Sequence, residues 1–401
     1  MGARQVVAAA AVFAAVLTVP APARAAAVCE QPGAAAPVAA GVPVEDRVYD
    51  PGRLGGFATG AGVRVAVIDS GVDAEHPQLR GRVAQGKDFL RGERSGRQDC
   101  AGHGTAVASI IAAAPAADTG FQGLAPDAVI VPVRISEQLE IGDDVRGDRG
   151  SPADFAEAID WAVDEGDADV INLSLVSQDN DAVRAAVARA IAAGVVVVAA
   201  VGNKGGPDDA NPDPFPAKYE GVIGVGAINN NGERATFSQR GDYVDLVAIG
   251  EPVTVANRVA GHASVSGTSF ATPFVSATAA LLKQRFPAIT PAQVRQRLIA
   301  TADPAPGGAS SIEYGSGALN PYRALTATLN TRGRPAPAPE VVKGADPAVA
   351  ALAARRERSQ QNAMLFAAIG AGVVLLLAVV AVVLRSGRRR GWGPAGPAAP
   401  D

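Results

Sequence analysis

The chain of 401 residues has room for one large domain together with targeting and anchoring segments. Its formal net charge of −4 comes with no basic stripe, which argues against nucleic acid as a partner. Aromatic residues make up only 4% of the chain and apolar residues 48%, so a core must consist mainly of Ala, Val, Ile and Leu, as in buried parallel strands.

The first residues have the composition of a secretory signal peptide. Arg4 precedes an apolar run over residues 6–19, and small residues follow up to Ala25. Because this run is shorter than the roughly 20 residues that span a bilayer, we expect a signal peptide, 1–25, that is removed rather than an N-terminal anchor. The mature chain would then begin with an N-terminal extension, 26–62.

Strand and helix patterns alternate through the middle of the chain. Apolar runs bounded by turn residues predict strands at 63–68, 129–133, 170–175, 195–201 and 222–225. Helical patterns cover 106–114, 152–163, 182–193, 269–282 and a stretch that begins at Thr290. Such alternation is typical of βαβ units. We therefore predict one α/β domain over 63–330, with three layers and a mainly parallel sheet between helices.

The last part of the chain has the pattern of a membrane anchor. The segment 331–362 is rich in Pro and Ala, as in an extended linker. Residues 363–384 are uncharged and apolar over a length that can cross a bilayer, and arginines follow in the tail 385–401. Because the signal peptide directs export, we expect a C-terminal transmembrane helix with the domain outside and the tail in the cytoplasm.

Three polar residues stand out as candidates for catalysis. A serine hydroxyl is a weak nucleophile near neutral pH, so it needs a base and a third group that orients the base. His103 lies between two glycines ahead of a helical run, whereas His76 lies in a turn and His262 in a polar loop, as structural or surface histidines often do. Asp69 ends the first predicted strand, and Ser269 follows a glycine-led turn into a helix.

The motifs around these residues together resemble the subtilisin-like (subtilase) family of serine proteases. They are VIDSG at 67–71, DCAGHGT at 99–105 and SGTSFATP at 266–273. They occur in the order Asp, His, Ser, as in subtilisin. The resemblance implies that Ser269 is the nucleophile, His103 the general base and then acid, and Asp69 the orienting carboxylate. The expected reaction is hydrolysis of polypeptides through an acyl-enzyme, with no cofactor and no metal.

A fourth motif extends the resemblance to the oxyanion hole. The segment AAVGNKG at 199–205 looks like the family's segment whose asparagine faces the developing oxyanion. Asn203 is therefore the expected donor, together with the backbone N–H of Ser269. The segment FPAKY at 215–219 resembles one with a cis proline, so we expect a cis bond before Pro216.

The resemblance also implies where the substrate binds. Ser174, Leu175 and Val176 form the expected substrate-binding segment, and Val176 stands where many relatives have glycine at the edge that pairs with the substrate backbone. Lys204 is expected on the rim of the pocket for the residue before the scissile bond. There it would disfavour Lys or Arg in the substrate, unless its side chain points into water.

Further features narrow the resemblance to the mycosins, membrane-anchored subtilases attached to type VII secretion systems. The extension 26–62 is too short for a folded inhibitory prodomain, and the C-terminal span fits a membrane anchor. Two cysteines in an exported chain, Cys29 and Cys100, predict one disulfide that tethers the extension near the catalytic histidine, with two unpaired thiols as the alternative.

Several functions stay open within this family. The resemblance implies limited processing of a secreted partner or component of a type VII secretion complex. The alternatives are a structural subunit that stabilises the complex, with cleavage secondary, and a degradative protease at the cell surface. An acidic cluster of Asp143, Asp144 and Asp148 is expected to be a solvated turn rather than a metal site.

Overall fold

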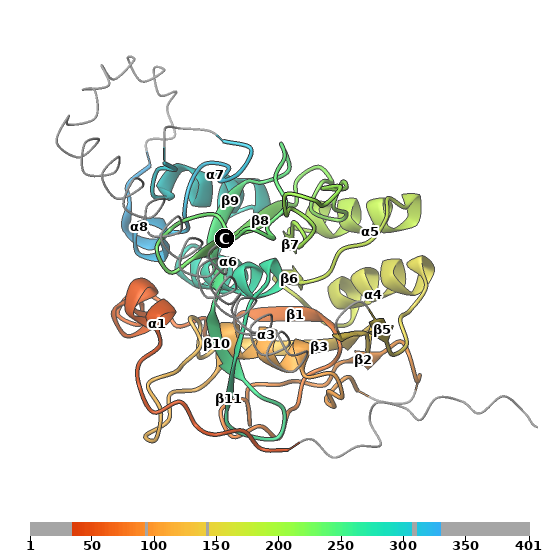
Figure 1. The fold of residues 1–401 in the computed structure, drawn as a ribbon, viewed down its shortest axis with the longest axis horizontal. Helices are drawn as coiled ribbons and strands as arrows, with labels where there is room; N and C mark the ends of the chain where they lie inside the picture. Colours follow the sequence, from red (N-terminus) through yellow and green to blue (C-terminus); the bar gives the residue numbers. More distant parts are fainter. Residues whose placement is uncertain (1–33, 93–94, 142–143, 307–310, 330–401) are drawn as a thin grey trace, which may run out of the picture. The chain divides into compact units, whose positions relative to one another are not determined.

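The computed structural model of the chain describes residues 34–92, 95–141, 144–306 and 311–329 (Figure 1). Cys29, the predicted signal peptide, the linker and the predicted transmembrane segment with its tail all lie outside the described residues. Within the described ranges, no helix combines the length and the apolar character that a membrane span requires.

A seven-stranded sheet runs through the domain in the order β2-β3-β1-β6-β7-β8-β9, and all its neighbouring strands pair in parallel. The strands are β1 (Arg64–Asp69), β2 (Lys87–Asp88), β3 (Val129–Arg134), β6 (Val170–Leu173), β7 (Val196–Ala200), β8 (Ile223–Asn229) and β9 (Leu246–Glu251). The predicted mainly parallel α/β sheet is confirmed. The chain adds β3 on one side of β1 and the later strands on the other, and open α/β sheets bind ligands where their strand order reverses in this way.

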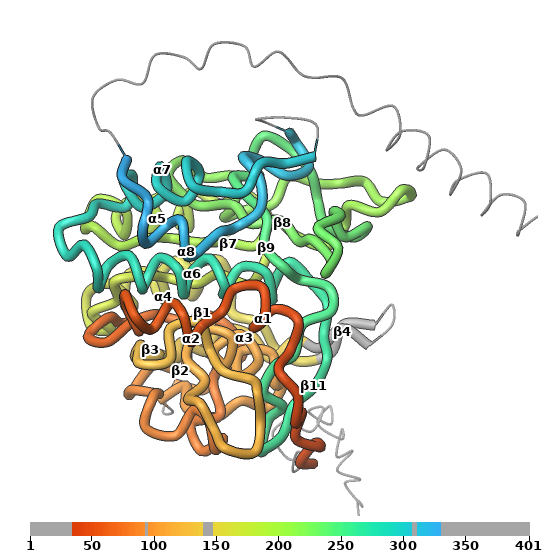
Figure 2. The backbone as a smooth tube through the Cα atoms, turned by 90° about the vertical axis from the view of Figure 1, so that its left-hand side faces the viewer, coloured from red at the N-terminus to blue at the C-terminus, as the bar shows by residue number. Residues whose placement is uncertain are grey.

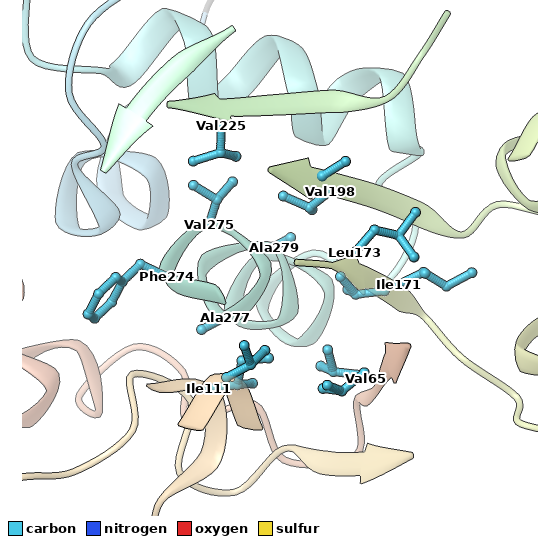
Figure 3. Packing of buried hydrophobic residues seen from close by; sticks show 14 of the residues in the cluster. Val65, Ile111, Ile171, Leu173, Val198, Val225, Phe274, Val275, Ala277 and Ala279 are labelled. Carbon is cyan, nitrogen blue, oxygen red and sulfur yellow. The ribbon is translucent and has the colours of Figure 1, made fainter. Parts of the chain in front are cut away.

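Helices cover both faces of this sheet, as predicted. The helices α3 (His103–Ala112) and α6 (Thr268–Arg285) pack together, and α4 (Pro152–Asp164) and α5 (Asp181–Ala192) form a second pair across the sheet (Figure 1). Figure 3 shows α6 surrounded by apolar side chains of β1, β6, β7 and β8 and by Ile111 of α3. Small residues such as Ala277 and Ala279 let α6 pack closely against the strands.

The helices predicted over 152–163 and from Thr290 have the N-caps Ser151 and Thr290. Ser151 Oγ accepts from Asp154 N at 3.2 Å, while Asp154 Oδ2 accepts from Ser151 N at 2.7 Å. Thr290 makes the same reciprocal pair with Gln293 and begins α7 (Pro291–Thr301). Each capping box satisfies backbone N–H groups that the first helical turn leaves without partners.

The extension before β1 is part of the folded domain, although the sequence pattern predicted no elements there. Residues 34–42, here called the arm, run beside the hairpin of β10 (Val253–Ala256) and β11 (His262–Val265) (Figure 2). Ala36 N donates to Ala260 O at 2.9 Å, and His262 N donates to Pro37 O at 3.0 Å. The arm therefore pairs with the hairpin through its backbone.

Two short helices follow the arm, α1 (Val44–Tyr49) and α2 (Pro51–Leu54). Tyr49 and Leu54 are buried in the same core as the sheet. Tyr49 Oη accepts from Ile249 N at 2.9 Å, and its ring centroid lies 4.8 Å from that of Phe274 in α6. These contacts anchor the start of the domain to β9 and α6.

Two members of the acidic cluster predicted as a solvated turn, Asp144 and Asp148, lie in and just after a small hairpin. Its strands are β4 (Leu139–Ile141) and β5 (Asp144–Arg146), which pair in antiparallel register. Residues 142 and 143, which join the two strands in the sequence, are outside the described residues. At the far end of the chain's described part, α8 (Pro321–Thr326) packs against α6 and α7.

Candidate active site

Asp69 and His103 form a hydrogen-bonded pair at one end of the sheet. Asp69 is the last residue of β1 and His103 the first residue of α3. Asp69 Oδ1 lies 2.7 Å from His103 Nδ1 and accepts from Ser70 N at 2.7 Å. Since Asp69 is only 4% exposed, its carboxylate holds the imidazole with Nδ1 protonated, which places the proton-accepting lone pair on Nε2.

Asp99 positions the loop that carries His103, a role that the sequence analysis missed. Its buried carboxylate accepts from Ser70 Oγ, from Gly102 N and from both the backbone N and Oγ1 of Thr105. Gly102 has a φ of 87°, which favours glycine, and a Cβ at Gly104 would lie 2.1 Å from a backbone oxygen. The glycine before the histidine is therefore favoured by its backbone conformation, and the glycine after it is required by close packing.

Ser269 lies at the start of α6, next to a residue whose ring lies near the histidine. It is the second residue of the helix, where its backbone N–H points out of the positive end of the helix dipole. The ring centroids of Phe270, the next residue, and His103 lie 5.2 Å apart. The end of β1 and the starts of α3 and α6, which carry the three predicted catalytic residues, thus lie near one another.

A series of hydrogen bonds between side chains of α6 and of the end of β6 leads to the backbone carbonyl of Ser269. Ser276 Oγ donates to Asn172 Oδ1 at 2.8 Å, and Asn172 Nδ2 donates to Ser174 Oγ at 2.9 Å. Ser174 Oγ in turn donates to Ser269 O at 2.7 Å. This series fixes the end of β6 relative to α6, and Leu175 follows it half-buried against the core.

Asn203 lies next to the turn that precedes Ser269. Its Oδ1 accepts from the backbone N and from the Oγ1 of Thr268, each at 2.9 Å. Those two bonds orient the amide, and Nδ2 lies 3.4 Å from the position of a Cβ at Gly267. Lys204 is exposed, and its backbone N donates to Gln239 Oε1 at 3.3 Å.

The chain after Ser174 is held on both sides. Val176 O accepts from Arg149 Nη2 at 2.9 Å. Ser177 N donates to Phe215 O at 2.6 Å. The cis peptide bond predicted before Pro216 is confirmed.

The other two histidines have structural contacts, but the polar loop predicted around His262 is wrong. His262 begins β11 and is buried, because its edge of the hairpin is covered by the arm. Its Nδ1 accepts from Ala39 N at 3.0 Å, and its Nε2 lies 2.7 Å from Gln78 Oε1. His76 Nε2 lies 3.3 Å from Gly261 O. Burial lowers the pKa of both imidazoles.

Cys100 is buried three residues before His103, and its proposed partner Cys29 lies outside the described residues. Arg134 Nη2 lies 3.5 Å from Cys100 Sγ, and its guanidinium also pairs with Asp88 and Glu137. Among the described residues there is no group of three or more His, Cys, Asp or Glu side chains that could hold a metal ion.

Comparison with known proteins decides the family. The profile of the subtilase family matches residues 60–317. The chain belongs to the subtilase family. Subtilisin E of Bacillus subtilis (strain 168) is 37% identical over 265 residues, which is 65% of this chain and 65% of that protein. This mycosin-like subtilase is a serine endopeptidase.

The mycosin relatives match a larger part of the chain. Mycosin-1 of Mycobacterium tuberculosis (strain ATCC 25618 / H37Rv) is 37% identical over 380 residues, covering 83% of each protein. The crystal structure of MycP1 from Mycobacterium smegmatis has a TM-score of 0.64 at 32% identity, covering 78% of this chain and 92% of that one. The structure of the MycP3 protease from the type VII (ESX-3) secretion system has a TM-score of 0.61 at 29% identity, covering 73% of this chain and 91% of that one.

Proposed function

We propose that this endopeptidase works through Asp69, His103 and Ser269 and processes a substrate or component of a type VII secretion system. The observation that carries the catalytic part is the 2.7 Å contact between Asp69 and His103, near the helix whose second residue is Ser269. A buried carboxylate in this position stabilises the imidazolium that forms when the histidine takes a proton.

The reaction follows from these positions. His103 Nε2 takes the proton of Ser269 Oγ as that oxygen attacks the scissile carbonyl carbon. The imidazolium then gives the proton to the leaving amine, and the acyl-enzyme remains on Ser269. Water, activated by the same histidine, hydrolyses the ester and restores the serine.

The oxyanion of the tetrahedral intermediate needs donors that are already in place. Asn203 Nδ2 and the backbone N–H of Ser269 supply them in our proposal, supported by the two bonds from Thr268 that orient the asparagine amide. Such preorganised donors strengthen as charge develops on the oxygen, so they stabilise the transition state more than the substrate.

The cellular setting is proposed from the sequence and from the mycosin relatives. A signal peptide at 1–25 would export the domain, and the apolar segment 363–384 would anchor it in the cell membrane. A disulfide between Cys29 and Cys100 would tie the start of the mature chain near the histidine loop. Mycosin-1 matches 83% of the chain, well beyond the part that subtilisin E covers, which supports a function in the same setting.

An activity-based probe tests the catalytic assignment. We expect a fluorophosphonate to label the exported domain and to lose all labelling in Ser269→Ala, because only an activated serine reacts rapidly. Ser266→Ala is the matched control, since Ser266 is an exposed serine of the same motif. Equal labelling of wild type and Ser269→Ala would reject the assignment.

A structural role in the secretion complex is the second candidate. It is favoured by the match to Mycosin-1, which includes residues outside the part shared with subtilisin E. Cells that carry Ser269→Ala separate the two functions. A scaffold keeps secretion normal without the nucleophile, whereas a processing enzyme leaves its substrate uncleaved.

A further inference from the structure

Arg149 lies on a segment that is fixed against the end of β1. Gly150 N donates to Ile135 O at 2.8 Å, and Ile135 N donates to Asp69 O at 2.8 Å. Arg149 itself forms an antiparallel bridge with Ser136. The backbone of Arg149 is therefore tied, through one intervening segment, to the carboxylate residue of the proposed triad.

The guanidinium of Arg149 reaches across to the chain that supports the serine. Its Nη2 donates to Val176 O at 2.9 Å. Val176 follows two residues after Ser174, which is bonded to Ser269 O, so along an extended chain the two positions are about 7 Å apart. Arg149 thus donates to a backbone carbonyl on the edge where we expect the substrate backbone to pair.

The Arg149 guanidinium is bonded to a neutral carbonyl rather than to a described carboxylate. Among residues with described side chains, no carboxylate forms an ion pair with it, and its bonded acceptor is a neutral carbonyl. Desolvation lowers the pKa of the Arg149 guanidinium. By contrast, the exposed Arg184 is paired with Asp179 and Asp181, and its pKa is raised. An incoming carboxylate would supply the partner that Arg149 lacks.

We propose that Arg149 is a specificity-determining residue that favours polypeptides with Asp or Glu a few residues before the scissile bond. A peptide N–H that pairs with the Val176 carbonyl shares that acceptor with Arg149 and so weakens the existing bond. An acidic peptide compensates for the weakened bond with an ion pair to the guanidinium. This inference rests on the proposed roles of Ser269 and of the segment 174–176.

Matched peptides test this preference. Fluorogenic substrates that differ only in Glu against Gln, at the second to fourth positions before the cleaved bond, are compared by kcat/KM. We expect wild type to prefer one of the Glu peptides by about three- to tenfold, the range for a partly exposed charge pair. Arg149→Gln should abolish the preference and cleave the Gln peptides faster, and Arg149→Glu should favour Lys at that position.

Arg184→Gln is the control, because it removes an exposed arginine of α5 whose partners are both nearby aspartates. It should keep the preference of wild type. Equal kcat/KM for all Glu and Gln pairs in wild type, or a preference that persists in Arg149→Gln, would overturn the proposal. Thermal unfolding of each variant verifies that it is folded.

Binding to an inactive variant separates this inference from the catalytic assignment. In Ser269→Ala, fluorescence polarisation should show tighter binding of the preferred Glu peptide than of its Gln partner. Adding Arg149→Gln should remove that difference, and raising the salt concentration should weaken it. Equal affinities in Ser269→Ala would contradict the role of Arg149, whatever the activity-based probe shows about catalysis.

Discussion

The catalytic groups and the N-terminal arm are held to the same domain by different kinds of contact. Around Asp69 and Ser269 the chain is fixed by strand and helix ends and by a line of neutral hydrogen bonds through Asn172. The arm and α1 depend on side chains that titrate, among them His262 and Asp46. The attachment of Ser269 to the end of β6 should therefore keep its geometry over a pH range in which the attachment of the arm changes.

Loss of a catalytic side chain should have the largest effect. Ser269→Ala and His103→Ala are each expected to lower kcat by about ten thousand- to a million-fold, with the double variant little worse, because the residues act as a unit. Thermal unfolding should change little in either variant. Losses that multiply in the double variant would show that the two residues act independently.

The oxyanion donor comes next. Asn203→Ala should lower kcat by about 100- to 1,000-fold with little change in KM, the magnitude known for the donor in subtilisin. The comparison variant is Arg184→Ala, whose exposed side chain on α5 is not part of the oxyanion hole. If kcat/KM falls in Asn203→Ala only because KM rises, with kcat unchanged, Asn203 would act in substrate binding instead.

Asp46 should destabilise the N-terminal helices at neutral and alkaline pH. Burial raises the pKa of its carboxyl to about 7, although Oδ2 accepts from Gln122 N at 3.0 Å and so favours the charged form. Because the folded pKa is raised, the domain loses stability as pH rises from about 4 through about 7. At pH 8 the free energy of unfolding of Asp46→Asn should exceed that of wild type by about 1 to 3 kcal/mol. At pH 4 the two proteins should have the same free energy of unfolding.

The measurement is denaturant unfolding of both proteins at the two pH values. The neighbouring Glu45, whose Oε1 accepts from Thr254 N at 2.6 Å, provides the control variant Glu45→Gln. A stability difference for Asp46→Asn that is the same at pH 4 and pH 8 would refute the raised pKa.

His262 should have a smaller effect in the opposite direction. Its folded pKa is lowered by burial and by the neighbouring His76, while Asp118 opposes the shift. The arm is therefore most firmly held above the unfolded pKa of about 6.5 and should loosen as pH falls below it, since protonated Nδ1 cannot accept from Ala39 N. We expect a cost of about 1 kcal/mol.

Hydrogen exchange of the Ala39 amide measures this loosening. Exchange should accelerate between pH 7 and pH 5, after correction for the intrinsic rate, while amides of α6 stay protected. His262→Asn keeps a neutral acceptor near Nδ1 and should remove the pH dependence. Protection of Ala39 that does not change with pH would rule out the role of His262.

The contrast also explains what the sequence could predict. Five strands of the sheet and the start of α4 were predictable because apolar runs and the Ser151 cap are local signals, whereas β2 and β9 were not predicted. The arm and α1 were missed because their stability comes from distant partners, such as Ile249 for Tyr49. A short polar helix has no local pattern that reveals such partners.

The candidate active site likewise contains residues that the sequence identified and residues that only the structure revealed. Motif order indicated the positions that meet around Ser269, but not the residues that hold them, Asp99 and Asn172. Asp99 lies in the motif of His103 and Asn172 in an apolar strand, but only the folded chain shows five hydrogen bonds converging on the Asp99 carboxylate. The one available signal was a buried asparagine within the apolar strand β6.

Identifying the labelled residue tests the central claim most directly. After reaction of the exported domain with a fluorophosphonate, peptide mass spectrometry locates the covalent adduct. The account predicts one adduct, on Ser269, whose rate of formation falls by orders of magnitude in His103→Ala. An adduct on another residue, or an equal rate in that variant, would contradict the proposed triad.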